Sequence, residues 1–249
     1  MDALKPGKAL YAALLTPQGK ILFDFLLIGA GDNTILIDCA RDRAADLIKR
    51  LTLYRLRTKL EITARPDLAV AAQWPEGPSA LPDEVYSFSG PRLLALGWRM
   101  VGPPEALRSL IGAGEPLGTY HAHRLSLGVP DSADLPPDTL FALDAGFEEL
   151  NGVNFHKGCF VGQEVTARMK HRSSARKRML IAQIAPPLPP PGTSIRAGER
   201  EIGTLASGQD GTALALVRLD RLAEAQAAGT SITVDGKPAT LKKPSWLGV

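Results

Sequence analysis

The sequence is poor in cysteine. Its two cysteines, Cys39 and Cys159, lie far apart and form no C-x-x-C pair. This excludes a disulfide scaffold and a structural zinc site built from cysteine ligands. Two thiols also cannot supply the four thiolates that an ordinary iron–sulfur cluster takes from one chain. We therefore expect no resident metal or cluster.

Long apolar runs are also missing. No run reaches the ~18 residues that a membrane span needs, and Met1 to Pro6 lack the charged-then-apolar pattern of a secretory signal. We therefore expect no membrane partner and a cytoplasmic location. The net charge of +3 is too small to indicate nucleic-acid binding by itself. With 249 residues, 45% of them hydrophobic, the chain can bury a sizeable core in two or three units.

The sequence does contain an unusual stretch from Lys157 to Glu164, which reads K-G-C-F-V-G-Q-E. Its glycines, Gly158 and Gly162, indicate a backbone that turns or closely approaches another segment. Lys157 lies near Cys159 in sequence and is expected to lower the pKa of the thiol if the loop brings the two together. Cys159 is then a candidate reactive residue. The alternative is that it is a small buried apolar side chain, which is also the interpretation of Cys39.

Apolar runs and turn residues predict the following elements before residue 130. Strands are expected over 9–15, 21–28, 34–39, 59–63 and 68–73, and a helix over 41–53. After the proline-rich run at 185–192, short apolar segments split by glycines predict a small β-barrel. Its strands are expected at 201–205, 213–217 and 231–234, with a short helix at 221–226.

A basic run extends from Arg168 to Arg178 and contains no acidic residue. Such a run suits phosphates or RNA, and it is equally typical of a solvated linker and strand edge. Few aromatic residues are interleaved with the cations, which argues against a stacking surface for single-stranded RNA. Nucleic acid is therefore a possible partner that the sequence does not favour.

The segment from Asn154 to Met169 resembles the signature of the YgfZ family. These are folate-binding proteins that support iron–sulfur enzymes, and they are related in fold to the glycine-cleavage T-protein, an aminomethyltransferase. The resemblance covers nearly the whole chain, except for a strand and a helix that family members carry before the first hairpin. Residues 104–111 and 119–127 are similar to two helices of the family. It implies an α+β fold with two ferredoxin-like subdomains over residues 1–175 and a small C-terminal β-barrel over 176–249.

The resemblance also implies a ligand and clients. A reduced folate such as tetrahydrofolate is expected in the cleft between the two halves, and iron–sulfur enzymes are the expected clients, served through Cys159. Leu143-Asp144-Ala145-Gly146 is similar to the L-E-A-G element of the T-protein, whose Glu holds the pterin. A carboxylate suits that role because it accepts two adjacent N–H donors strongly. The alternative is that Asp144 caps a short helix. The basic run from Arg168 to Arg178 then also suits the acidic tail of a polyglutamylated folate. The remaining folate-binding candidates are Lys157, Gly158, Phe160, Gly162, Gln163, Glu164 and Arg168.

A different function stays open through Asp24. The first hairpin of T-protein relatives carries two adjacent Asp residues, one of them catalytic, and here the pair has become Phe23 and Asp24. Asp24 is thus the candidate catalytic carboxylate of a tetrahydrofolate-dependent one-carbon transferase. Because burying an unpaired carboxylate is costly, the alternative is that Asp24 faces solvent. A non-enzymatic folate- or RNA-binding module is the third possibility.

Overall fold

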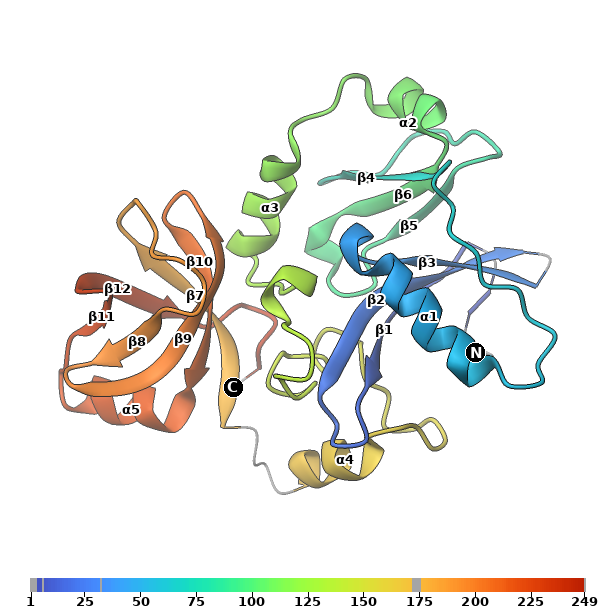
Figure 1. Ribbon diagram of the computed structural model, residues 1–249. Coiled ribbons are helices and arrows are strands. Elements are labelled where there is room, and N and C mark those ends of the chain that lie inside the picture. Colours follow the sequence, from blue (N-terminus) through green and yellow to red (C-terminus); the bar gives the residue numbers. More distant parts are fainter. Residues whose placement is uncertain (1–3, 6, 32, 172–175, 249) are drawn as a thin grey trace. The chain divides into compact units, whose positions relative to one another are not determined.

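The computed structural model describes residues 4–5, 7–31, 33–171 and 176–248. The chain divides into two compact units, one of Met1–Ala12 with Phe23–Gly114 and one of Ala13–Leu22 with Glu115–Val249. Figure 1 labels their helices and strands. Among the described residues, no helix is long and apolar enough to cross a membrane.

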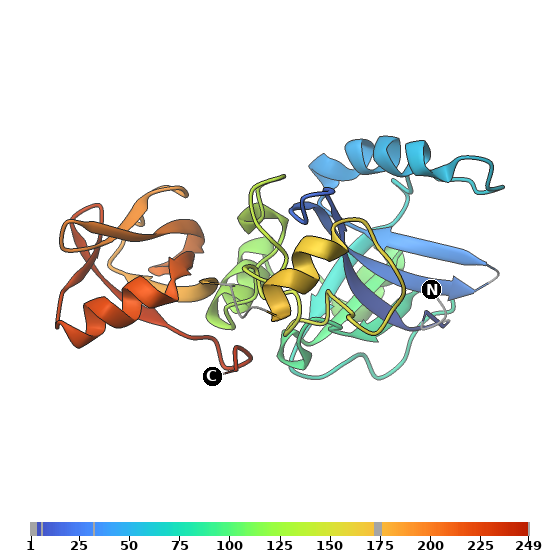
Figure 2. The ribbon, with the colours of Figure 1, turned by 90° about the horizontal axis from the view of Figure 1, so that it is seen from below.

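The first sheet has the order β1-β2-β3, formed by β1 (Ala9–Leu15), β2 (Ile21–Gly31) and β3 (Thr34–Asp38). The turn between β1 and β2 belongs to the second unit. A single 3-10 turn, η1 (Arg41–Arg43), leads into α1 (Ala44–Arg55), which runs along this sheet in Figures 1 and 2. The predicted hairpin, third strand and helix are confirmed.

The second sheet is antiparallel, with the order β4-β6-β5. It consists of β4 (Ala69–Gln73), β5 (Tyr86–Ser89) and β6 (Trp98–Gly102), with the 3-10 turn η2 (Leu94–Leu96) before β6. Helix α2 (Pro104–Ile111) packs on it through a core that includes Met100 and Leu107. The strand predicted over 59–63 is wrong, because these residues form no strand and most are exposed to solvent.

After the β1–β2 turn, the second unit continues with α3 (Leu117–Ser126) and the 3-10 turn η3 (Ser132–Asp134). Residues 142–151 then form consecutive turns instead of a helix. The alternative in which Asp144 caps a short helix is therefore wrong. Helix α4 (Gln163–His171) starts inside the K-G-C-F-V-G-Q-E stretch.

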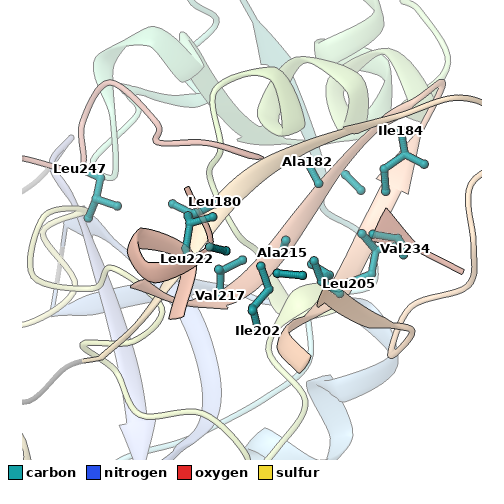
Figure 3. Close-up of a cluster of buried hydrophobic side chains, with 14 residues drawn as sticks. Leu180, Ala182, Ile184, Ile202, Leu205, Ala215, Val217, Leu222, Val234 and Leu247 are labelled. Carbon is teal, nitrogen blue, oxygen red and sulfur yellow. The ribbon is translucent and has the colours of Figure 1, made fainter. Parts of the chain in front are cut away.

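The chain ends in a closed six-stranded barrel with the order β10-β7-β12-β11-β8-β9. Apolar side chains such as Leu180, Ile202 and Ala215 fill its interior (Figure 3). The prediction of an α+β chain that ends in a small β-barrel is confirmed. The elements of this part are β7 (Lys177–Ile184), β8 (Ser194–Ala197), β9 (Arg200–Gln209), β10 (Thr212–Arg218), α5 (Leu219–Ala227), β11 (Ile232–Val234) and β12 (Lys237–Lys242).

Candidate functional site

The K-G-C-F-V-G-Q-E stretch forms a loop that leads directly into α4. At its C-terminal end the backbone is fixed by hydrogen bonds. The Phe160 N–H donates to the side-chain Oε1 of Gln163 at 3.0 Å, and the Gln163 N–H donates to the Phe160 carbonyl at 3.2 Å. Thr166 donates from both its N–H and its hydroxyl to the Gly162 carbonyl, at 3.2 and 3.0 Å. Phe160, Gly162 and Gln163 thus hold the conformation of the loop.

The two glycines of the loop differ in their surroundings. Gly162 has φ +83°, and a Cβ there would lie 2.7 Å from the Thr16 carbonyl oxygen and 2.9 Å from Gly19 Cα. At Gly158 a Cβ would meet nothing within 4 Å. The close approach predicted for the glycines is confirmed at Gly162, whereas Gly158 lies in open space.

Cys159 is exposed next to Gly158, and the alternative of a small buried side chain does not hold for it. The Lys157 ammonium lies over the Phe160 ring, 4.9 Å from its centroid. Activation of the thiol by Lys157 stays a prediction. Cys39, in contrast, is half-buried. Burial raises the pKa of the Cys39 thiol, and the Asp38 carboxylate raises it further.

The two charged candidates on α4 pair with each other. Glu164 and Arg168 form an exposed i,i+4 ion pair at 2.7 Å, an arrangement that contributes little stability. Helix α4 is also tied to the preceding turns through Lys170, which forms an ion pair with Glu148 and lies over the Phe155 ring. The middle of the predicted basic run, residues 172–175, lies outside the described residues.

Asp144 is a buried carboxyl group in the same unit as the cysteine loop, with 7% of its surface exposed. Burial raises its pKa from 3.8 to about 6, against the opposing effect of Arg178 and Lys177 on β7. The neighbouring Gly146 has φ +76°, and a Cβ there would lie 2.7 Å from the Trp246 ring. The L-D-A-G element is therefore a packed turn that keeps one carboxyl group away from water.

Asp24 lies in the first unit, where it is 8% exposed. The Tyr11 hydroxyl donates to its Oδ2 at 3.3 Å. The Tyr11 ring in turn lies 5.4 Å from the guanidinium of Arg92, which is also buried. The alternative in which Asp24 faces solvent is wrong. The carboxylate is buried and hydrogen-bonded, as a buried charge requires.

Sequence reasoning missed a buried polar cluster centred on Arg124. Its guanidinium lies 2.7 Å from Asp134, 2.8 Å from Asp131 and 2.8 Å from the Ser207 hydroxyl of β9. Asp134 also accepts hydrogen bonds from the N–H and hydroxyl of Ser207. His121 contacts the guanidinium at 2.9 Å, and burial together with Arg124 lowers the pKa of His121. The cluster links α3, η3 and the barrel, and its one sequence signal is a cation followed by two acids around a turn.

Comparison with known proteins gives these features a context. Residues 176–249 match the family model of the CAF17 C-terminal β-barrel domain. The human iron–sulfur cluster assembly factor IBA57 is 33% identical over 237 residues, which cover 87% of this chain and 66% of the human protein. The chain is a homologue of the IBA57 proteins. The Neurospora crassa IBA57 homologue is 32% identical over 202 residues, 72% of this chain and 46% of that protein. The chain thus spans only part of these curated relatives.

A solved structure supports the fold. The glycine cleavage system aminomethyltransferase T from Bartonella henselae superposes with a TM-score of 0.71 at 18% identity, covering 97% of this chain and 76% of that one. The predicted T-protein-like fold is thereby confirmed. The IBA57 relatives and the T-protein fold agree with the predicted resemblance only in part, because they do not single out the YgfZ family. The division of domains at residue 175 stays a prediction.

The prediction of a cytoplasmic location is contradicted by these relatives. The human, mouse and Neurospora proteins are all named as mitochondrial. The prediction rested on the composition of the first residues. The lack of a long apolar run and of a secretory signal pattern does not identify the compartment in which a folded protein works.

Proposed function

We propose that this chain is an iron–sulfur cluster assembly factor that acts through the Cys159 thiol. The observation that carries the proposal is the contrast within one loop. Gly162 and Gln163 are held by close packing and hydrogen bonds, whereas Cys159 is exposed beside an unobstructed glycine. A thiolate is the usual protein ligand of iron–sulfur clusters. The names of the human and Neurospora relatives support the same role.

The cluster, or its iron, is the cargo in this proposal. One thiolate cannot hold a cluster, and the part of the chain that the structure describes contains no group of three or more His, Cys, Asp or Glu residues able to hold a metal ion. Cys159 would therefore share the cargo with a partner protein that supplies the other ligands. An exposed thiol on a loop fixed at its C-terminal end suits such a transient contact, because it is accessible without unfolding of α4.

The proposed cofactor is tetrahydrofolate, with Asp144 as acceptor for the pterin N–H groups. What supports it is the chemistry of the carboxyl group. Burial makes ionised Asp144 costly, and two adjacent N–H donors would compensate that cost. Lys157 and Arg168 are the candidate cations for the glutamate tail. Titration calorimetry with tetrahydrofolate tests this proposal, and the absence of heat at millimolar ligand would contradict it.

The cysteine proposal is tested by comparing Cys159→Ser and Cys159→Ala with the unmodified chain in cells that lack their own IBA57. The readout is the activity of cluster-dependent enzymes. Cys39→Ser is the matched control, since Cys39 is the other thiol of the chain. We expect both Cys159 variants to fail and the control to rescue. Full rescue by either Cys159 variant at wild-type protein level would exclude a role for the thiol.

A second candidate function is one-carbon transfer by Asp24. Asp24 is buried and accepts a hydrogen bond from Tyr11, which favours a functional role for this carboxylate over a surface position without a role. The test is the formation of methylene-tetrahydrofolate from an aminomethyl donor. Activity that is present in the unmodified chain and lost in Asp24→Asn would support the transferase. If neither the unmodified chain nor Asp24→Asn forms methylene-tetrahydrofolate, the transferase function is excluded and the assembly role is retained.

A further inference from the structure

The end of α1 carries an exposed apolar cluster, which we call the α1-end patch. It consists of Leu53, Tyr54, Leu56 and Leu60, whose exposed fractions are 64%, 54%, 84% and 51%. Every residue from Thr52 to Glu61, in the last turn of the helix and the loop after it, is exposed. Figure 2 shows the helix and this loop along one side of their unit. Clustered exposed apolar side chains mark interaction sites.

The charge of the segment that carries the patch is positive up to Lys59, and the acidic Glu61 follows Leu60. Between Asp46 and Glu61 the sequence has no acidic residue. Two of the cations hold the patch together, since Arg55 donates to the Leu60 carbonyl at 3.1 Å and the Arg50 guanidinium lies 5.9 Å from the Tyr54 ring. Within the described residues, no ion pair neutralises the five cations of this segment, which are Lys49, Arg50, Arg55, Arg57 and Lys59.

The backbone at Leu56 is strained. Its φ of 49° and ψ of −119° lie in a region that favours glycine. A leucine there costs backbone energy and, being 84% exposed, contributes almost no burial in return. Strain without a packing benefit is a feature of functional sites. The leucine is therefore best explained by a contact made outside the chain.

We propose that the α1-end patch binds the surface of an anionic membrane. The cations would attract acidic lipid headgroups, the leucines would enter the boundary of the acyl chains, and Tyr54 would lie at headgroup level. A second copy of the chain is disfavoured because it would bring two cationic patches together. An acidic protein partner is the alternative occupant that the test below distinguishes from a membrane. Such a peripheral contact needs no membrane-spanning segment, and the proposal does not depend on the assembly role.

The test is co-sedimentation of the full chain with two kinds of vesicle, phosphatidylcholine alone and phosphatidylcholine mixed with an equal part of phosphatidylglycerol. We expect binding to the mixed vesicles only, weakening as salt is raised. Leu53→Asn combined with Leu56→Asn should reduce partitioning about tenfold or more by removing the inserted side chains. Arg57→Gln combined with Lys59→Gln should reduce it about fivefold for each cation removed.

Two matched controls address non-specific effects. Leu117→Asn changes a leucine that is 83% exposed elsewhere. Lys242→Gln with Lys243→Gln removes two charges from the barrel end of the chain. Both controls should bind as the unmodified chain does, and thermal denaturation should show that Leu56→Asn does not destabilise the protein, since asparagine tolerates positive φ.

Three outcomes would overturn the proposal. The first is no binding to the mixed vesicles, and the second is equal loss of binding in the Lys242 and Lys243 control, which would indicate net charge alone. The third is displacement from the vesicles by soluble polyglutamate together with unchanged binding of the leucine variants. That result would assign the patch to an acidic protein partner.

Discussion

Gly19 and Gly162 occupy the space that each other's side chain would need. A Cβ at Gly162 would lie 2.9 Å from Gly19 Cα, and a Cβ at Gly19 would lie 3.2 Å from the Gly162 carbonyl oxygen. Both residues have positive φ, +80° and +83°. The turn between β1 and β2 is thereby packed against the start of α4, and this contact fixes the C-terminal end of the Cys159 loop.

Gly162→Ala is expected to destabilise the protein by about 2–4 kcal/mol, because it combines a left-handed backbone with a backbone clash. Gly158→Ala in the same loop is the control. It meets open space and should change the free energy of unfolding by less than about 0.5 kcal/mol. Urea unfolding measures both. Equal effects of the two substitutions would contradict the close approach at Gly162.

Asp134→Ala is expected to cost about 3–5 kcal/mol, since it leaves the buried Arg124 guanidinium without its fully buried partner. Replacing both residues by apolar ones, as in Arg124→Met with Asp134→Leu, should cost less than the single change, because no unpaired charge remains. Chemical denaturation monitored by fluorescence gives the comparison.

The control for this cycle is the exposed pair of Arg108 and Glu105, at 2.6 Å. Its removal by Glu105→Ala should change the unfolding free energy by less than about 1 kcal/mol. If the double variant Arg124→Met with Asp134→Leu is less stable than Asp134→Ala, the ion pair stabilises the fold by more than the cost of leaving one charge unpaired.

Local signals explain what the sequence could predict. Helix α2 has the bounds that the family resemblance implied, and its local signals agree, since Pro104 starts it and Gly112 follows its end. The hairpin of β1 and β2 follows from two apolar runs around Gly19. Strands β8 and β12 were missed, since the sequence of β12, K-P-A-T-L-K, is mostly polar and resembles a loop. What makes β12 a strand is its pairing with β7, which closes the barrel.

The candidate site shows the same limit. The sequence indicated that Gly162 approaches another segment, and only the fold identifies that segment as the turn at Gly19. Asp24 was left between solvent and a buried site, because the donor that decides the matter, Tyr11, lies on the neighbouring strand. Arg124 was missed because its partner Ser207 lies 83 positions away.

Alkylation should distinguish the two cysteines. In the folded protein at pH 7.5, iodoacetamide is expected to modify the exposed Cys159 at least tenfold faster than Cys39. Burial and Asp38 raise the pKa of Cys39, so its thiolate fraction at that pH is reduced, and partial burial limits access. Peptide mass spectrometry over time gives both rates. In urea the two rates should converge, and a faster reaction at Cys39 in the native protein would contradict the described environments.

Asp144 gives the stability a pH dependence of defined sign. Its pKa is raised from 3.8 to about 6 by burial, so between these values the folded state binds more protons than the unfolded state. The contribution of this group to the free energy of unfolding therefore falls as pH rises from 4 to 6 and stays low above that range. Asp144→Asn removes the ionisation and should stabilise the protein at pH 7.5 by about 1–3 kcal/mol, with little effect at pH 4. Asp83→Asn, at an exposed position, is the control and should change stability by less than about 0.5 kcal/mol at both pH values.

If Asp144 also holds a pterin, the Asp144→Asn variant that gains stability should lose tetrahydrofolate binding. The binding of the unmodified chain should weaken as pH falls through about 6, where the carboxylate becomes protonated. A destabilised Asp144→Asn at pH 7.5 would show that the ionised carboxylate is compensated by partners stronger than Lys177 and Arg178.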